Sequence, residues 1–216
     1  MKNYIYIHIC CINNYKNIFN TLLYNIKFYG LYDIIDEIRC IVIGSNNDYS
    51  IFSDSKIKII YQSNDINIYE FKAMELIYKH SIQEDFNILY IHTKGVKHYK
   101  MATEEYVKDW VNMMIYFNIG NYKKCLSYLK ENDVVGVNLQ PDPWHFSGNF
   151  WWSKSEHIKK LGIIEDYNYN GPEFYITKRK EGKYISLWNS NINHYISKYD
   201  QELYVDKFNI FTPLKS

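Results

Sequence analysis

Several motifs that identify common enzyme classes are missing from this chain. No G-x-G-x-x-G or Walker-type glycine loop occurs, and neither an H-E-x-x-H nor a G-x-S-x-G sequence is present. These absences disfavour three functions: dinucleotide-dependent redox chemistry, nucleoside-triphosphate hydrolysis and serine hydrolysis.

Cysteine is also scarce. The four cysteines, Cys10, Cys11, Cys40 and Cys125, include no C-x-x-C spacing. This pattern predicts neither a zinc knuckle nor a disulfide framework. Reduced, mostly buried thiols are typical of a cytoplasmic protein, and that is the localisation we expect.

An excess of one charge is absent as well, since 25 basic residues accompany 24 acidic ones and the net charge is +1. A nucleic-acid-binding surface usually brings a strong basic excess, so we expect no nucleic-acid partner. No apolar run approaches the roughly 18 residues of a membrane span. Residues 1–12 are apolar but contain His8 and tyrosines, which indicates a strand and not a signal peptide.

Aromatic residues, by contrast, are abundant: they make up 18% of the chain, with 23 tyrosines. Asparagine, isoleucine and lysine are also frequent, and a coding bias toward these residues explains the excess without any function. A single tyrosine or asparagine is therefore no evidence of a site. The 216 residues contain no repeat, no proline- or serine-rich linker and no charge block, so we expect one domain over residues 1–216.

Strand-like and helix-like segments alternate over the first two thirds of the chain. Short apolar runs predict strands at residues 4–9, 38–43, 57–61, 87–91 and 134–139, with a further strand-like piece at 184–188. Helical spacing predicts helices that end at Gly30, that cover 69–81, 104–120, 122–130 and 155–161, and that begin at Gly171-Pro172-Glu173. This alternation predicts an α/β fold, in which helices cover both faces of a sheet.

A polar tetrapeptide, His92-Thr93-Lys94-Gly95, closes the predicted strand 87–91. The carboxyl ends of strands are where open α/β sheets bind ligands. An ammonium group can pair with a diphosphate, and an imidazole can bind a metal or a phosphate oxygen. A solvated loop explains the same residues equally well.

The segment 141–152 is the most unusual part of the chain, because it holds two of the four prolines and three of the five tryptophans. The prolines predict an irregular, extended loop, and Gly148 allows a backbone conformation or a close approach that other residues resist. Flat rings beside the polar groups of Asp142, His145, Ser147 and Asn149 suit a sugar, which has an apolar face and a rim of hydroxyls. A tryptophan-rich core turn with one satisfied histidine is the alternative.

Four pieces of the chain together resemble a small glycosyltransferase family with the GT-A fold, found in large DNA viruses and in bacterial polysaccharide gene clusters. They are Y-I-H-T-K-G at 90–95, D-W at 109–110, D-V-V-G-V-N at 133–138 and H-F-S-G-N-F-W-W at 145–152. The octapeptide is the most specific of them, and the likeness covers residues 4 to 180 approximately. Rhamnan-synthesis proteins are more distantly similar.

The resemblance implies a single-domain, GT-A-like (Rossmann-like) mixed sheet and the transfer of a hexose or deoxyhexose. The donor would be a nucleotide sugar, with a UDP-sugar favoured, and the acceptor a glycan or glycoprotein. In such folds a D-x-D motif after the fourth strand holds a divalent metal on the diphosphate. Here His92-Thr93-Lys94 stands at that place. Either Lys94 supplies the charge, or Mn²⁺ or Mg²⁺ is held by His92 with Asp142 or His145.

These considerations assign a role to each candidate residue. Glu173, with Asp142 as second choice, is the expected catalytic base for an acceptor hydroxyl. The expected donor-binding residues are His92, Thr93, Lys94, Gly95, His145, Ser147, Gly148, Asn149, Trp151 and Trp152. Glu173 also lies where a helix dipole favours a carboxylate without any function. A carbohydrate-binding module that keeps the fold without the chemistry is the alternative to an enzyme.

Overall fold

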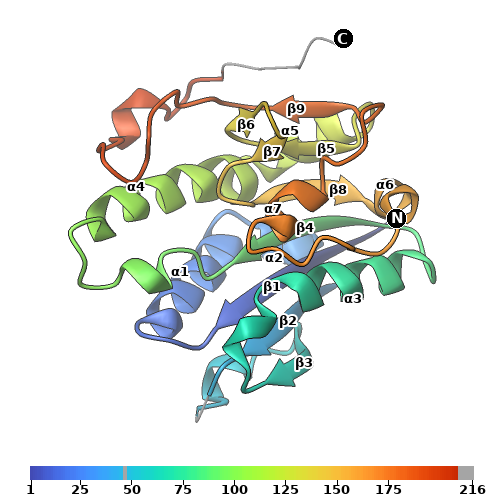
Figure 1. The fold of residues 1–216 in the computed structure, drawn as a ribbon, viewed down its shortest axis with the longest axis horizontal. Helices are drawn as coiled ribbons and strands as arrows, with labels where there is room; N and C mark the ends of the chain where they lie inside the picture. The colour runs from blue at the N-terminus through green and yellow to red at the C-terminus, as the bar shows by residue number, and fades with distance from the viewer. Residues whose placement is uncertain (46–47, 209–216) are drawn as a thin grey trace.

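The computed structural model describes residues 1–45 and 48–208, and a seven-stranded sheet runs through its centre (Figure 1). The strands of this sheet are β1 (Lys2–Cys10), β2 (Glu37–Ile43), β3 (Ile57–Ser63), β4 (Phe86–His92), β5 (Val134–Gly136), β8 (Trp151–Lys154) and β9 (Tyr184–Ser186). A separate two-stranded ribbon consists of β6 (Leu139–Gln140) and β7 (His145–Phe146).

The strand order is β3-β2-β1-β4-β8-β5-β9. Neighbouring strands run parallel except at β8, which is antiparallel to both β4 and β5. The chain first builds outward from β1 to β3 and then returns to place β4 on the other side of β1. The carboxyl ends of β1 and β4 therefore lie together where the order changes direction, the usual ligand position in such sheets.

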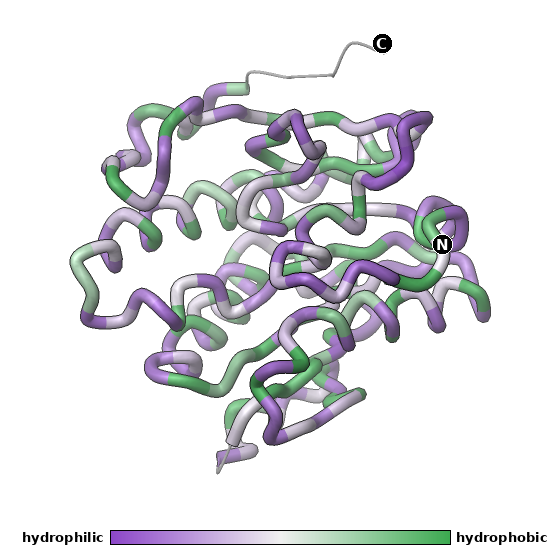
Figure 2. Tube along the Cα trace, viewed as in Figure 1, coloured by the Kyte–Doolittle hydropathy of each residue, from purple (hydrophilic) through white to green (hydrophobic). Residues whose placement is uncertain are grey.

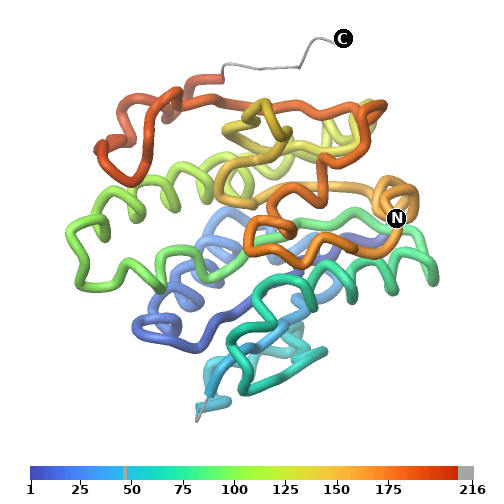
Figure 3. The backbone as a smooth tube through the Cα atoms, in the orientation of Figure 1, coloured from blue at the N-terminus to red at the C-terminus, as the bar shows by residue number. Residues whose placement is uncertain are grey.

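Helices cover both faces of the sheet. One face carries α1 (Tyr15–Phe28), α4 (Glu104–Ile115) and α5 (Tyr122–Leu129), with a short π-helix, Tyr116–Gly120, between the last two. The other face carries α3 (Phe71–Ser81), α6 (Ser155–Leu161) and α7 (Gly171–Tyr175), and α7 lies beside α3 (Figure 3). The short α2 (Leu31–Ile34) follows α1. The predicted α/β architecture, a mixed sheet flanked by helices on both faces, is confirmed.

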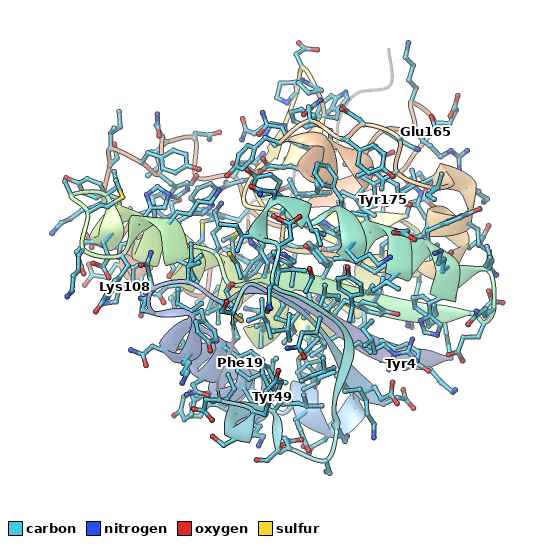
Figure 4. The ribbon with its side chains drawn as sticks, turned by 60° about the horizontal axis from the view of Figure 1, so that its bottom comes forward. Tyr4, Phe19, Tyr49, Lys108, Glu165 and Tyr175 are labelled. Atoms are coloured by element: carbon cyan, nitrogen blue, oxygen red, sulfur yellow. The ribbon has the colours of Figure 1, made fainter. Side chains whose placement is uncertain are left out.

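The alternation of side chains along β1 explains the two layers of core. Ile5, Ile7 and Ile9 belong to the core under α1 and α4, whereas Tyr4 and Tyr6 belong to the core under α3, because successive side chains of a strand point to opposite faces. The strands are apolar along much of their length (Figure 2), as expected for a sheet buried on both sides. Phe19 and Tyr175, labelled in Figure 4, belong to the two different cores.

Two predictions about the second half of the chain are wrong. The predicted strand 134–139 is divided between β5 and β6, because Asn138 adopts a positive φ of 52° that breaks the extended run. Trp151 and Trp152, predicted to lie in an irregular loop, instead begin β8 and pair with β4 and β5. None of the helices in the described ranges has the length and apolarity needed to cross a membrane.

Candidate functional site

A cavity of about 270 Å³ lies at the carboxyl ends of β1 and β4. Residues 92–98 supply one wall, the start of α3 another, and the start of α7 a third. The predicted site residues that line it are His92, Thr93, Lys94, Gly95, Gly148, Asn149 and Glu173. The cavity therefore brings together three segments that are far apart in the sequence.

The loop after β4 is anchored to β1 and presents its side chains to the cavity. The buried hydroxyl oxygen of Thr93 accepts a hydrogen bond from the backbone N–H of Cys10 (3.0 Å). The Nε2 atom of His92 donates to the carbonyl oxygen of Gly148 (3.0 Å), which fixes the imidazole against residues 141–152, here called the aromatic segment. Burial lowers the pKa of His92, a trend that Glu70 opposes and Lys94 reinforces, so the ring is neutral near pH 7.

Lys94 is the cation inside the cavity. Its ammonium lies 4.0 Å from the ring centre of Trp110, which is cation–π geometry. Desolvation lowers the pKa of Lys94, while the carboxylates of Glu173 and Glu70 act in the opposite direction. These two acids therefore help to keep the ammonium charged in a partly dry place.

Glu70, which the sequence did not single out, stands at the centre of the polar network. Its Oε2 atom accepts hydrogen bonds from the Tyr90 hydroxyl (2.6 Å) and from Nδ2 of Asn149 (2.8 Å). Its Oε1 atom lies 3.8 Å from Nδ1 of His92. Desolvation opposes ionisation of this carboxyl, but the neighbouring His92, His8, Tyr90 and Lys94 together hold the pKa of Glu70 below its ordinary value.

The backbone just before Glu70 is strained. Tyr69, another lining residue, has φ 46° and ψ −142°, a combination that residues with a Cβ rarely adopt and that clusters at functional sites. This conformation turns the chain from the 3₁₀ turn Ile66–Ile68 into α3 and points Glu70 toward β4. No residue pattern near position 70 predicts such a turn from the sequence.

His8 is the second missed residue. It pairs with His92 in the register of β1 and β4 and lines the same cavity, although its side chain is only 5% exposed. Burial lowers the pKa of His8 to about 4, so the ring is neutral. The sequence held a signal for His8, because it lies near the carboxyl end of β1 and His92 ends the neighbouring parallel strand β4.

The aromatic segment contributes mainly backbone and positioning groups. Gly148 has φ 96°, and a Cβ there would lie 2.5 Å from Sδ of Met114, so only glycine fits this close approach. Oδ1 of Asn149 accepts from the indole N–H of Trp151 (2.8 Å), while Nδ2 donates to Glu70. Both ends of the Asn149 amide are thus engaged within the protein, while Asn149 lines the cavity.

The two tryptophans are core residues and not a pocket wall. Trp151 and Trp152 are both 0% exposed, and neither lines the cavity. Trp151 stacks on Tyr90 at 5.1 Å, and the indole N–H of Trp152 donates to the carbonyl oxygen of Asn118 (2.8 Å). Buried tryptophans usually pair their N–H in this way.

Asp142, His145 and Ser147 also lie outside the cavity lining. Asp142 is exposed in the turn between β6 and β7, and Nδ1 of His145 donates to the carbonyl oxygen of Pro143 (2.8 Å). The predicted metal set of His92, Asp142 and His145 is therefore not brought together. Across residues 1–45 and 48–208, no group of three histidine, cysteine or acidic side chains is arranged to hold a metal ion, so we derive no step through one.

Glu173 lies in the cavity, in the first turn of α7, as predicted. Its Oε1 atom accepts a hydrogen bond from the backbone N–H of Gly148 (2.9 Å). This contact joins the third wall of the cavity to the aromatic segment. The other carboxylate oxygen, Oε2, has no hydrogen bond to the described residues.

The rim of the cavity is aromatic and basic. Nζ of Lys97 lies 3.3 Å from the hydroxyl of Tyr169, and the ring of Tyr169 meets that of Tyr69 edge-on at 5.3 Å. Tyr195 stands on the rim too, packed against Trp110. Tyr169 is 63% exposed and Tyr195 43% exposed, so both rings are available to a ligand.

A family model for a domain of unknown function, DUF8361, matches residues 38–202. The chain belongs to the DUF8361 family. The part of the cavity that comes from within the DUF8361 match includes Glu70, His92, Lys94, Asn149 and Glu173, whereas His8 precedes it.

No curated protein matches this DUF8361 member. Among solved structures, the chain is similar to 4-diphosphocytidyl-2C-methyl-D-erythritol synthase from Anaerococcus prevotii DSM 20548, at 12% sequence identity and a TM-score of 0.48. The similarity covers 95% of this chain and 99% of that one.

Proposed function

We propose that this protein is a glycosyltransferase that moves a hexose or deoxyhexose from a nucleotide-sugar donor to a glycan or glycoprotein acceptor. The observation that carries the proposal is the meeting of two distant motifs at one cavity. Residues 92–95 and residues 148–149 come from the two most distinctive motifs and line the same cavity at the carboxyl ends of β1 and β4. That position is the usual ligand site of such a sheet.

The cations of the cavity suit a diphosphate leaving group. Lys94 lies within the cavity and Lys97 at its rim. A nucleoside diphosphate develops negative charge as the glycosidic bond to it breaks, and positioned cations stabilise that charge most in a poorly hydrated site. We place the diphosphate against Lys94 for this reason, with Lys97 closing over it.

The wall formed by α7 suits the acceptor. Glu173 is held by the Gly148 N–H through one oxygen, and in an inverting transfer its other oxygen accepts the proton of the attacking hydroxyl. The exposed rings of Tyr169 and Tyr195 lie on the rim next to it. Aromatic faces beside a polar group suit the apolar face of a sugar ring.

A thermal-shift screen with UDP, GDP, dTDP and ADP, each with and without Mn²⁺ or Mg²⁺, tests the proposal. A ligand that binds the folded state raises the melting temperature by mass action, so we expect at least one diphosphate to do so. The matching nucleotide sugars are then assayed for transfer and hydrolysis.

Two outcomes contradict the proposal. If no nucleoside diphosphate stabilises the protein and no nucleotide sugar in a broad panel is turned over, the enzyme hypothesis is removed. Binding of glycans without any response to nucleotides instead supports a carbohydrate-binding module on a degenerate glycosyltransferase fold.

A further inference from the structure

The floor of the cavity presents hydrogen-bond acceptors that have no donor. The first is Nε2 of His8, a buried atom without any hydrogen-bond partner. The ring is neutral, because burial lowers the pKa of His8 to about 4, and a neutral imidazole can present a lone pair at Nε2.

His92 and Glu70 add two more acceptors at the same place. His92 donates from Nε2 to the carbonyl oxygen of Gly148, so its Nδ1 is also a bare lone pair. That Nδ1 atom lies 3.8 Å from Oε1 of Glu70, the carboxylate oxygen that neither Tyr90 nor Asn149 occupies. The side chains of Glu70 and His92 are 22% and 13% exposed, so a ligand in the cavity reaches them. His8 pairs with His92 in the register of β1 and β4 and lines the same cavity.

Two donors beside this cluster already serve the other oxygen of Glu70, since the Tyr90 hydroxyl and the Asn149 amide both donate to Oε2. The Lys94 ammonium lies over Trp110 and makes no hydrogen bond to Glu70 among the described residues. A buried acceptor without a donor costs about 1–3 kcal/mol, and more when it is charged. Two imidazole lone pairs and one carboxylate oxygen therefore call for a ligand group that donates several hydrogen bonds and carries positive charge.

We propose that His8, His92 and Glu70 form a subsite for the ammonium group of an amino sugar. This inference rests on the proposed transferase function and names the class of sugar that the site takes. An ammonium has three N–H donors and one positive charge, which matches three acceptors and one carboxylate. A hydroxyl donates a single hydrogen bond and brings no positive charge to Glu70.

Charge balance in the filled cavity supports the same ligand. The ammonium neutralises Glu70 and leaves Lys94 and Lys97 free for the two or more negative charges of a diphosphate. A divalent metal has less support, because no group of three histidine, cysteine or acidic side chains within the described residues is arranged to hold one.

Calorimetric titration with matched sugars tests the subsite. Nucleotide sugars that carry a free amine at C2, C3 or C4 are each compared with their N-acetyl and hydroxyl counterparts. A second set of experiments uses acceptor substrates, because the amine belongs to either the donor sugar or the acceptor sugar. It compares the KM of amino glycosides with that of the same glycosides after N-acetylation. We expect at least one amine to be preferred over both counterparts by tenfold or more.

Glu70→Gln is the decisive variant. The amide oxygen can still accept from Tyr90 and Asn149, which places the new NH₂ group at the position of Oε1, facing His92. The protein then supplies its own donor, so the fold is kept and the preference for the amine falls at least tenfold. His8→Phe should lower the preference as well. Glu75→Gln is the control, since Glu75 pairs with Lys72 and Lys79 on the outer side of the same helix.

The outcomes separate this inference from the function on which it rests. Equal affinity for amine, N-acetyl and hydroxyl forms in both arms overturns the subsite, as does a preference that Glu70→Gln leaves unchanged. Binding of Mn²⁺ or Zn²⁺ alone that is lost in Glu70→Gln also overturns it in favour of a metal site. If no nucleoside diphosphate binds at all, the transferase proposal itself fails.

Discussion

The loop after β4 presents its side chains to the cavity, whereas the aromatic segment before β8 presents chiefly backbone. His92, Thr93 and Lys94 all line the cavity, but of residues 141–152 only Gly148 and Asn149 do. The tryptophans of that segment are sealed between the sheet and its helices. A distinctive sequence motif can therefore build the support of a site and not its surface.

The two segments nonetheless depend on each other. Hydrogen bonds run from the Trp151 indole to Asn149 and from Asn149 to Glu70, which faces His92. The carbonyl oxygen of Gly148 accepts a hydrogen bond from His92, and its N–H donates one to Glu173. Supporting groups of this kind fix the geometry of the groups that contact a ligand. The predictions below separate the contacting residues from the supporting ones.

The largest effect is expected at Glu173, which touches the aromatic segment but serves the reaction in our proposal. Glu173→Gln keeps an oxygen to accept the N–H of Gly148 and removes the base. We expect kcat to fall about 10²–10⁴-fold with little change in donor affinity, because only the transition state uses the proton transfer. Steady-state kinetics with calorimetry of the donor measure both quantities.

The exposed Glu165, labelled in Figure 4, provides the control for this experiment. Glu165→Gln removes an equal charge outside the cavity lining and should leave kcat unchanged. A loss of less than tenfold in Glu173→Gln would assign that residue to holding Gly148 and not to catalysis.

Trp151→Ala should strongly destabilise the folded protein. The ring is fully buried, stacks on Tyr90 and donates to Asn149. Truncation of a buried tryptophan costs about 3–5 kcal/mol of the free energy of unfolding. Urea denaturation measures the loss, and Tyr24→Ala, at a ring that is 63% exposed, should change it by no more than about 0.5 kcal/mol. A small loss at Trp151 would return this ring to the role of a pocket wall.

Much of the fold followed from periodicity alone. Helical spacing located α3, α5 and α6 to within a few residues, and apolar runs located β1, β2, β3 and β4. Burial on both faces makes such strands apolar throughout, so their runs are easy to see. β8 was missed because two tryptophans beside prolines and a glycine suit a loop as well as a strand, and only the pairing with β4 and β5 decides between them.

The residues of the candidate site also fall into those that the sequence predicts and those that it does not. His92 and Lys94 were predictable because the end of a parallel strand is a ligand position wherever the strand lies. Glu70 was not, because its place beside His92 depends on the turn at Tyr69 and on the packing of α3 against the sheet. Whether a tryptophan borders a ligand or fills the core is likewise a tertiary property that its identity does not reveal.

Asn149→Asp tests the supporting chain of hydrogen bonds. Aspartate resembles asparagine in shape and tolerates the positive φ of 57° at this position, but it replaces the donor of Nδ2 with a carboxylate oxygen beside Oε2 of Glu70. Like charges at this distance raise a pKa. We therefore expect the pKa of Glu70 to rise and about 1.5–3 kcal/mol of stability to be lost at pH 7.

The pH dependence of unfolding checks the sign of this effect. Because the fold holds the pKa of Glu70 below its ordinary value, its contribution to stability is present above the unfolded-state pKa and is lost as the pH falls through the folded one. In Asn149→Asp this acid loss should shrink or reverse. Combining it with Glu70→Gln restores a donor and an acceptor in exchanged order and should recover stability; no recovery would refute the pairing.

The smallest effect, and the sharpest test of the loop after β4, is expected at Lys94. Lys94→Met keeps an apolar stem against Trp110 and removes the charge. Desolvating a diphosphate without a counter-charge is costly, so we expect nucleoside-diphosphate binding to weaken by tenfold or more, equivalent to about 1.4 kcal/mol. Lys97→Met, at the rim, should weaken it less, because exposed charges are screened by solvent and salt. Titrations at low and high salt compare the two variants. Unchanged affinity in Lys94→Met would remove this loop from the diphosphate site and leave the start of α7 and the rim as the remaining places for the nucleotide.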